Sequence, residues 1–213
     1  MIILSGHTKG GVGKSTVAIL LAVARAAAGR KVWVIDGDRQ KSTALALQVR
    51  ADAPGDRPFI AVSEISDGRQ LRTQVLGQAD QFDDIIIDAG GRDSTAMRAA
   101  LTVVDVALVP LEPRAFGAWA LDDLLAMVDE ANSVRDGLRV VAFLNRADPA
   151  GPDNAQTLDE ARKNPQLEVV TAKLGDRKAF PTAAARGASV LDGKDPKAVE
   201  EMQSLIDSIF QST

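Results

Sequence analysis

The sequence IILSGHTKGGVGKST, residues 2–16, joins a short apolar run to a glycine-rich loop that ends in Lys14-Ser15. It nearly matches the phosphate-loop pattern G-x-x-x-x-G-K-[ST], with Thr8 standing where the first glycine is expected. An apolar strand precedes the loop and a helix, predicted from about Gly13 to Ala28, follows it. In that setting backbone N–H groups and the helix N-terminus can surround phosphate groups. The stretch therefore predicts a nucleotide-binding loop inside an α/β fold.

The rest of the chain repeats this alternation of strand and helix. Apolar runs without a polar alternation, such as residues 84–88, are typical of strands covered on both faces, which means a parallel sheet. We expect strands at 2–5, 31–35, 59–62, 84–88, 103–110, 138–145 and 169–172, and helices at 13–28, 42–48, 117–132, 154–163, 179–186 and 196–210. The prolines and glycine of residues 51–58 predict a loop. We predict one α/β domain over residues 1–213, a P-loop NTPase fold with a mostly parallel central sheet and helices on both faces.

Composition excludes several classes of protein. The 213 residues contain no cysteine and one histidine, which rules out disulfide scaffolds, iron–sulfur centres, cysteine nucleophiles and histidine-based zinc sites. Hydrophobic residues make up 46%, enough for a folded core, and the net charge of −4 argues against a surface coated in basic charge. The longest apolar run, residues 17–24, is shorter than the roughly 20 residues of a membrane span. With no targeting segment seen, we expect a cytoplasmic protein.

Carboxylates at the ends of two expected strands predict a metal site beside the loop. Asp36 ends the second strand and Asp88 the Ile-rich run, and parallel sheets gather their ligands at such ends. Lys14 is expected to reach the β- and γ-phosphates and Ser15 to ligate Mg²⁺, while Asp38 can orient an attacking water. Each aspartate also has a plainer interpretation, because Asp caps helices and forms turns.

Other polar residues allow more than one interpretation. Lys9 is either a solvated loop lysine or a side chain that meets nucleotide on a second subunit. We expect His7 to be a hydrogen-bond donor within the loop rather than a catalyst. Asn145 and Arg146 either contact a base edge, in a spacing similar to the guanine-reading element of GTPases, or form a turn. The hydroxyl of Ser42 is expected to cap the helix that begins there.

These motifs together resemble the ParA family, the deviant-phosphate-loop ATPases that also include MinD. The resemblance covers most of the chain and is carried by the blocks Lys9–Thr16, Asp36–Ser42, Ile85–Gly91, Val106–Pro110 and Phe143–Arg146. The length is similar to that of the small plasmid partition ATPases. The sequence departs from the family pattern at Arg39, where the switch segment usually has proline, so the segment loses a fixed φ and gains a charge.

The resemblance implies roles for these residues. Lys9 would cross a nucleotide-sandwich homodimer, Asp38 would position the hydrolytic water, and Asn145 with Arg146 would contact adenine, which favours ATP over GTP. Mg²⁺ would lie among Ser15, Asp36 and Asp88. The residues that would hold ATP are Lys9, Gly10, Gly11, Val12, Gly13, Lys14, Ser15, Thr16, Asn145 and Arg146.

The function that the resemblance implies is an ATP-dependent switch for plasmid partition or cargo positioning. Its dimer would bind DNA nonspecifically at the nucleoid, and a ParB-type or other adaptor would stimulate its slow hydrolysis. Basic residues in the last third are candidates for the DNA surface, above all Arg177, Lys178 and Arg186, with Arg162, Lys163 and Lys173 nearby in sequence. The alternatives are a MinD-like ATPase on membranes, against which the acidic segment 199–210 argues, and a metabolic enzyme of the dethiobiotin-synthetase type.

Overall fold

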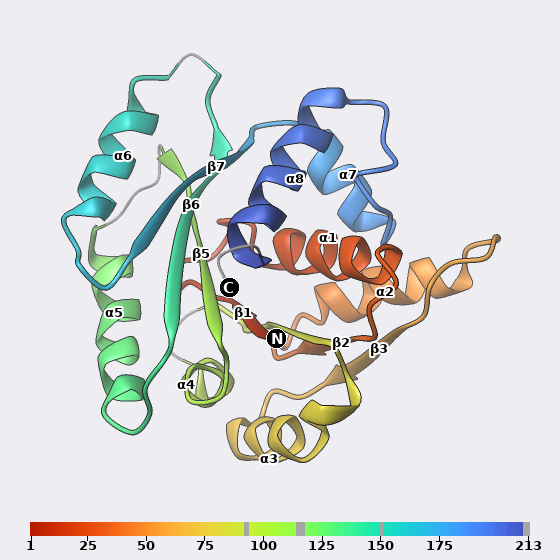
Figure 1. The fold of residues 1–213 in the computed structure, drawn as a ribbon, viewed down its shortest axis with the longest axis horizontal. Coiled ribbons are helices and arrows are strands. Elements are labelled where there is room, and N and C mark those ends of the chain that lie inside the picture. Colours follow the sequence, from red (N-terminus) through yellow and green to blue (C-terminus); the bar gives the residue numbers. More distant parts are fainter. Residues whose placement is uncertain (92–93, 114–117, 150, 211–213) are drawn as a thin grey trace.

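One sheet lies between two layers of helices (Figure 1). The computed structural model describes residues 1–91, 94–113, 118–149 and 151–210. Its strands are β1 (Ile2–Ser5), β2 (Val32–Asp36), β3 (Ile60–Glu64), β4 (Asp84–Asp88), β5 (Val106–Leu111), β6 (Arg139–Ala147) and β7 (Glu168–Gly175). Its helices are α1 (Lys14–Ala27), α2 (Ser42–Asp52), α3 (Gly68–Gln78), the 3₁₀ helix η1 (Ala79–Gln81), α4 (Thr95–Leu101), α5 (Ala118–Asn132), α6 (Asp153–Arg162), α7 (Ala179–Ala185) and α8 (Pro196–Phe210).

The seven strands follow the order β3-β2-β4-β1-β5-β6-β7, and each neighbouring pair runs parallel. The predicted α/β class, with helices on both faces of a parallel sheet, is confirmed. The neighbouring strands β1 and β4 are followed by α1 and α4, which leave on opposite faces of the sheet. Ligands of such sheets bind where the connections diverge in this way. The fold therefore places a binding crevice at the carboxyl end of β1.

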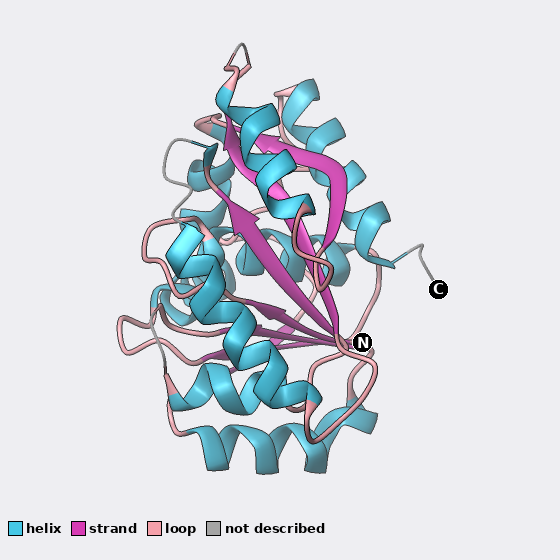
Figure 2. Cartoon of the chain, turned by 90° about the vertical axis from the view of Figure 1, so that its left-hand side faces the viewer, coloured by secondary structure: helices cyan, strands magenta, loops and turns pink. Residues whose placement is uncertain are grey.

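Each face of the sheet has its own hydrophobic core. Helices cover the sheet on both of its faces (Figure 2). Helices α1, α2, α7 and α8 pack on one face, and α3, α4, α5 and α6 on the other. Side chains alternate between the two cores along each inner strand, as Ile86 and Ile87 do on β4. Because both faces are apolar, the inner strands show the unalternated runs that predicted a parallel sheet.

Two helices of the second layer were not predicted. α3 has 11 residues but buries only Gly68, Leu71 and Val75, so its apolar periodicity is weak. α4 buries Ala96, Met97, Ala100 and Leu101 at helical spacing, but its seven residues are too few for the pattern to stand out in a window of about 11–18 residues. Their N-caps are nevertheless present in the sequence, because the side chain of Asp67 accepts from Gln70 N–H and that of Ser94 from Met97 N–H. The predicted strand at 103–110 also began too early. Val103 and Val104 belong to the turn that ends α4, and both are buried there.

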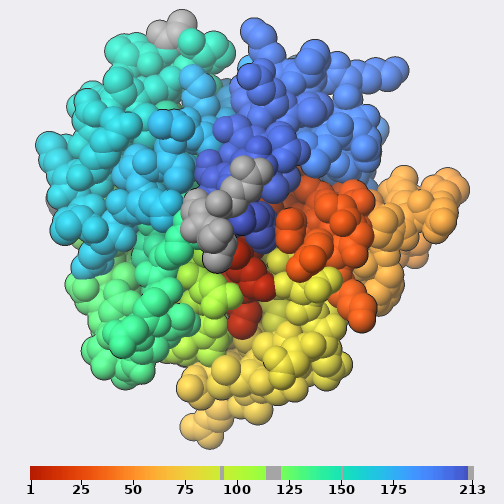
Figure 3. Space-filling view, in the orientation of Figure 1, coloured from red at the N-terminus to blue at the C-terminus, as the bar shows by residue number. Residues whose placement is uncertain are grey.

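The C-terminal helix closes the first core beside the N-terminal one. Figure 3 shows the segment of α7 and α8 (blue) lying against α1 (orange-red). The guanidinium of Arg25 on α1 lies 3.8 Å from the centre of the Phe210 ring on α8. As predicted, α8 begins with Pro196, whose fixed φ suits the first turn of a helix.

None of the helices in the described residues is long and apolar enough to cross a membrane.

Candidate functional site

The carboxyl ends of three neighbouring strands bring the polar site residues to one level. Ser5 of β1 and Asp36 of β2 both pair in register with Asp88 of β4. All three side chains are buried, each with 1% exposure. The carbonyl of Asp88 also accepts from Gly37 N–H at 2.8 Å, which holds the loop after β2 against β4. The sheet register, rather than any local motif, thus fixes the spacing of the two carboxylates.

The loop between β1 and α1 depends on two glycines. Gly11 and Gly13 have φ values of 81° and 95°, a conformation that L side chains rarely adopt. A Cβ on Gly13 would also lie 2.2 Å from Nδ2 of Asn145. That Nδ2 donates to the Val12 carbonyl at 2.7 Å, so Asn145 supports the loop from below. Its predicted contact with adenine stays a prediction.

Lys14 is largely buried inside the loop. Its Nζ donates to the carbonyl of Lys9 at 3.0 Å and lies close to Gly91 of the segment after β4. Burial lowers the pKa of Lys14, while the charges of Asp88 and Asp38 act in the opposite direction. An ammonium group held this way, with a backbone carbonyl as its partner, is available to more strongly accepting phosphate oxygens.

A cleft of about 780 Å³ opens above the loop. Its lining includes most of the residues predicted for catalysis and nucleotide binding, namely Lys9, Gly10, Gly11, Gly13, Lys14, Ser15, Thr16, Asp38 and Arg146. Four other predicted residues do not line it. Val12, Asp36, Asp88 and Asn145 are buried beneath it. The cleft also brings in Thr8, Gln40, Ser42 and Gly91, which lie in the recognised sequence motifs but had no predicted role in nucleotide binding.

The segment after β2 forms a turn above Asp36. The N–H of Lys41 donates to the Asp38 carbonyl at 3.1 Å, which closes a turn with Arg39 at its second position. Proline is favoured at that position of a turn but not required. The replacement of proline by Arg39 therefore leaves the turn in place. The Asp38 carboxylate itself accepts from the N–H of Gln40 at 3.0 Å and borders the cleft.

The expectation that Ser42 caps α2 is wrong. The N-cap position is held by Lys41, in a left-handed conformation with φ 54°, and no side-chain cap is formed there. Asp36 supplies the missing acceptor instead, because its Oδ2 accepts from Ala44 N–H at 2.9 Å. The Ser42 side chain is exposed at the cleft. Burial raises the pKa of Asp36, and its hydrogen bonds from Ala44, Asp38 and Thr43 N–H act against this.

Asp88 has one satisfied and one unsatisfied carboxylate oxygen. Its Oδ2 accepts from the hydroxyl of Thr43 at 2.6 Å, whereas Oδ1 is buried with no hydrogen-bond partner. Burial raises the pKa of Asp88 to about 6, against the effects of Thr43, Ser15 and Lys14. A buried acceptor without a donor costs free energy, which indicates a place for water or a cation that the protein alone does not supply.

This donor set fits Mg²⁺. The described residues contain no group of three or more His, Cys, Asp or Glu able to hold a metal by themselves. Mg²⁺ does not need one, since it keeps several waters and takes one or two protein groups plus substrate phosphates. The hydroxyl of Ser15 borders the cleft, and the free Oδ1 of Asp88 can accept from a metal-bound water.

The raised pKa of Asp88 predicts a conflict between stability and function. In nucleotide-free protein the pKa of about 6, against 3.8 in the unfolded chain, means that ionised Asp88 costs on the order of 3 kcal/mol. The folded state holds this proton more tightly, so stability falls as pH rises from about 4 to above 6. Asp88→Asn should therefore be more stable than wild type at pH 7.5 and gain nothing at pH 4, as measured by urea unfolding.

A matched control lies at the other end of the same strand. Asp84 is equally buried, but its Oδ2 accepts from Nε of Arg25 at 2.7 Å. Asp84→Asn should lose stability at pH 7.5, because it leaves a partly buried guanidinium without its counter-ion. If Asp88→Asn is also destabilised at that pH, the ionised Asp88 carboxylate is compensated within the fold and the predicted conflict does not exist.

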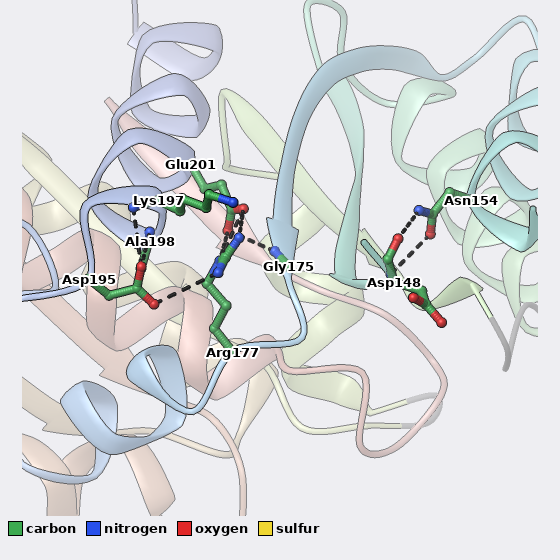
Figure 4. Close-up of polar contacts among 8 residues, drawn as sticks. All are labelled: Asp148, Asn154, Gly175, Arg177, Asp195, Lys197, Ala198 and Glu201. Carbon is green, nitrogen blue, oxygen red and sulfur yellow. Dashed lines mark hydrogen bonds and ion pairs between the residues drawn. The ribbon is translucent and has the colours of Figure 1, made fainter. Parts of the chain in front are cut away.

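A second pocket of about 410 Å³ lies beside the first and shares Arg146 with it. Glu112, Asp148 and Asp176 also line it, so the N-R-x-D segment borders the pocket. Arg146 has a φ of 53° and its Nη1 donates to Glu112 at 3.2 Å. Asp148 is held in the loop after β6 by reciprocal hydrogen bonds between its backbone and the Asn154 side chain (Figure 4).

The three main DNA candidates differ in their surroundings. Arg177 points from the loop after β7 toward α8 and makes a two-pronged ion pair with Glu201, its Nη2 lying 2.9 Å from Oε1 and its Nε 3.0 Å from Oε2 (Figure 4). This pair raises the pKa of Arg177. Lys178 and Arg186 are exposed at the two ends of α7. The observations thus favour Lys178 and Arg186 over Arg177 for contact with a ligand.

His7 does not act as expected at its δ nitrogen. Its Nδ1 accepts from Lys9 N–H at 3.0 Å, so the ring is an acceptor there rather than a donor. Burial lowers the pKa of His7 to about 4, and the charges of Lys14 and Lys9 act in the same direction. The imidazole is therefore neutral near pH 7, with its proton on Nε2.

Comparison with known proteins gives a consistent picture. The family model described as the CobQ/CobB/MinD/ParA nucleotide binding domain matches residues 3–190. The chain is 28% identical to Protein ParA of Rhizobium radiobacter over 137 residues, which are 63% of this chain and 59% of that protein. It thus spans less than two thirds of that relative. It is 21% identical over 209 residues to the maintenance of carboxysome distribution protein A of Halothiobacillus neapolitanus, covering 97% of this chain and 94% of that one.

Solved structures share the fold. The ATP complex of an Asp-to-Ala variant of Cyanothece McdA superposes with a TM-score of 0.80 over 98% of this chain and 95% of that chain, at 16% identity. At that identity the likeness concerns the fold alone. The family match, by contrast, extends over most of the chain and includes the phosphate loop and both aspartate strands. This chain therefore belongs to the CobQ/CobB/MinD/ParA family of nucleotide-binding proteins, the ParA/MinD family that its phosphate loop resembles.

Proposed function

We propose that this chain is an ATP-dependent switch of the partition or cargo-positioning type. The observation that carries the proposal is that one cleft is lined by Lys14 and Ser15 of the loop, by a second lysine, Lys9, and by the carboxylate of Asp38. ATP would occupy the cleft with its phosphates on the loop. Mg²⁺, near Ser15 and Asp88, would neutralise phosphate charge there. Asp38 would orient the water that attacks the terminal phosphate.

Lys9 gives the switch its dimeric state in this proposal. Its backbone carbonyl accepts from Lys14, so the part of the loop around Lys9 borders the proposed phosphate site of its own chain. Lys14 serves those phosphates, and the Lys9 side chain would serve the phosphates of a second copy. Lys9→Ala should therefore bind nucleotide as a monomer and form no dimer. Sedimentation with a slowly hydrolysed ATP analogue measures this directly.

A mixing experiment shows whether Lys9 acts across the dimer. Lys9→Ala keeps its own nucleotide site, and Lys14→Ala keeps a Lys9 that it can offer to a partner. Each variant should be inactive alone, and their mixture should recover part of the ATP hydrolysis through one composite site. If Lys9→Ala dimerises normally, the proposed role across the dimer is wrong and Lys9 is a solvated loop residue.

We further propose that the dimer binds DNA nonspecifically through α7. Lys178 and Arg186 flank this helix and are exposed. Arg177 is paired with Glu201, so replacing Arg177 would also break an ion pair within the fold and would not test DNA contact alone. The protein is acidic overall, so two copies of a small basic patch are needed for useful affinity. Lys178→Ala with Arg186→Ala should weaken binding on every duplex alike and reduce the salt dependence.

The control for the DNA test removes the same charge elsewhere. Arg69 and Arg72 are exposed on α3, which packs on the opposite face of the sheet. Arg69→Ala with Arg72→Ala should leave binding nearly unchanged in shift assays with ATP. If both double variants lose the same DNA affinity, the effect comes from net charge and not from α7. If wild type binds DNA equally well in ATP and in ADP, the proposed coupling to dimerisation is wrong.

An adaptor of the ParB type would reset the switch by stimulating hydrolysis, as the resemblance implies. The membrane alternative has less support, because the apolar face of α8 is buried in the first core, with Met202, Leu205 and Ile209 nearly inaccessible. Co-sedimentation with anionic vesicles and with DNA, each in ATP, separates the two. Analysis of the products of ATP turnover tests the metabolic alternative, since a switch releases only ADP and phosphate.

A further inference from the structure

The backbone of Lys9 is held on both sides of its Cα, through its N–H and through its carbonyl. Its N–H donates to Nδ1 of His7 at 3.0 Å, and its carbonyl accepts from Nζ of Lys14, also at 3.0 Å. His7 is itself buried, with 5% exposure, at the base of the loop. We expect the two contacts to respond differently to nucleotide. Phosphate oxygens compete with the Lys9 carbonyl for the Lys14 ammonium. They cannot compete for Nδ1 of a neutral His7, because that nitrogen is itself an acceptor, and the Lys9 N–H already donates to it.

We propose that His7 is a positioning residue for Lys9. Its hydrogen bond would hold the backbone of Lys9 in place when nucleotide draws the Lys14 ammonium away from the Lys9 carbonyl. The hydrogen bond spans two residues, from the side chain of residue 7 to the N–H of residue 9, as in an Asx-turn. It fixes the direction in which the Lys9 side chain leaves the loop. This inference rests on the proposed role of Lys9 toward the partner's phosphates.

The state of the ring supports this assignment. Only a neutral imidazole has a lone pair at Nδ1 to accept the Lys9 N–H. His7 is surrounded by the positive charges of Lys14 and Lys9, which together with burial favour the neutral form. Because His7 is the only histidine in the chain, its ring nitrogens give an unambiguous ¹⁵N NMR signal. We expect an unprotonated Nδ1 and a protonated Nε2 at pH 7.

Three substitutions separate positioning from general packing. His7→Ala removes the acceptor, His7→Asn places an amide oxygen where it can accept the same N–H, and His7→Gln offers the same amide one carbon too far away. Dimer affinity with a slowly hydrolysed ATP analogue should fall roughly tenfold in His7→Ala and in His7→Gln and recover in His7→Asn. Nucleotide affinity of the monomers should change much less. Thermal unfolding of each variant checks that the fold is retained.

The mixing experiment provides the decisive readout. In the mixture of Lys9→Ala with Lys14→Ala, only the Lys14→Ala chain offers a Lys9 to its partner. Adding His7→Ala to that chain should lower the recovered hydrolysis roughly tenfold, whereas adding it to the Lys9→Ala chain should have little effect. A symmetrical loss, or no rescue by His7→Asn, overturns the role of His7. If the mixture with His7 intact recovers nothing, the proposed role of Lys9 fails first, and this inference fails with it.

Discussion

Lys14→Ala is expected to lose ATP affinity by at least a hundredfold, roughly 3 kcal/mol, because in the proposed site the ammonium group would make charge-assisted contacts with two phosphates. The protein without nucleotide should tolerate the change. There Lys14 is a buried cation with a lowered pKa, and its Nζ contacts the Lys9 carbonyl rather than a carboxylate. Removing it relieves burial of a charge at the expense of one hydrogen bond. Fluorescent-nucleotide titration and urea unfolding measure the two effects separately.

A surface lysine provides the control for this change. Lys163, directly after α6, is exposed, pairs with Glu160 of that helix and lies outside the cleft. Lys163→Ala removes the same charge and should leave ATP affinity unaltered within a factor of about two, since exposed pairs contribute little. If Lys14→Ala retains normal affinity, the assignment of residues 9–16 as the phosphate site is wrong.

The glycine-rich loop between β1 and α1 could be predicted from sequence because its geometry is local. The glycines at 11 and 13 have positive φ, the strand before them is a short apolar run, and the helix after them is a long apolar pattern. The inner strands were predictable for a similar reason, since each is apolar on both faces. Helix α3 was missed because few of its side chains are buried, and α4 because it has only seven residues, although their N-capping residues Asp67 and Ser94 could have indicated both.

The parts of the site that sequence could not supply depend on contacts between distant segments. Thr43 donates to Asp88 from 45 residues away, and Asn145 reaches Val12 across 133 residues. Motif rules describe residues close together in the sequence, so they do not predict hydrogen bonds between residues this far apart. The sequence also predicted Ser42 as the cap of α2, and the cap is instead an aspartate from the preceding strand. Local capping rules failed there because the helix begins inside the binding site, where a side chain from the sheet competes for its N–H groups.

The second large effect is expected at Asp38. Asp38→Ala should bind ATP and dimerise normally yet hydrolyse ATP about 10²- to 10⁴-fold more slowly, since a group that positions water acts in the transition state and little in the ground state. The structure supports a separation of nucleotide binding from hydrolysis. Asp38 borders the cleft but lies outside the loop that would hold the phosphates, and its Oδ1 accepts only a local N–H, that of Gln40, among the contacts defined in the described residues.

Asp38→Asn distinguishes this chemical role from turn formation. The amide oxygen of Asn can accept from Gln40 N–H at the same position, and the turn that Lys41 closes on the Asp38 carbonyl uses backbone atoms alone. If Asp38 serves only the turn, Asn restores wild-type hydrolysis. If its carboxylate must orient the water and receive charge as the attack develops, Asn stays slow while nucleotide affinity and dimerisation match wild type. Single-turnover hydrolysis, measured on the preformed dimer, compares the three proteins at the chemical step, and a wild-type rate in Asp38→Ala would mean that another residue orients the water.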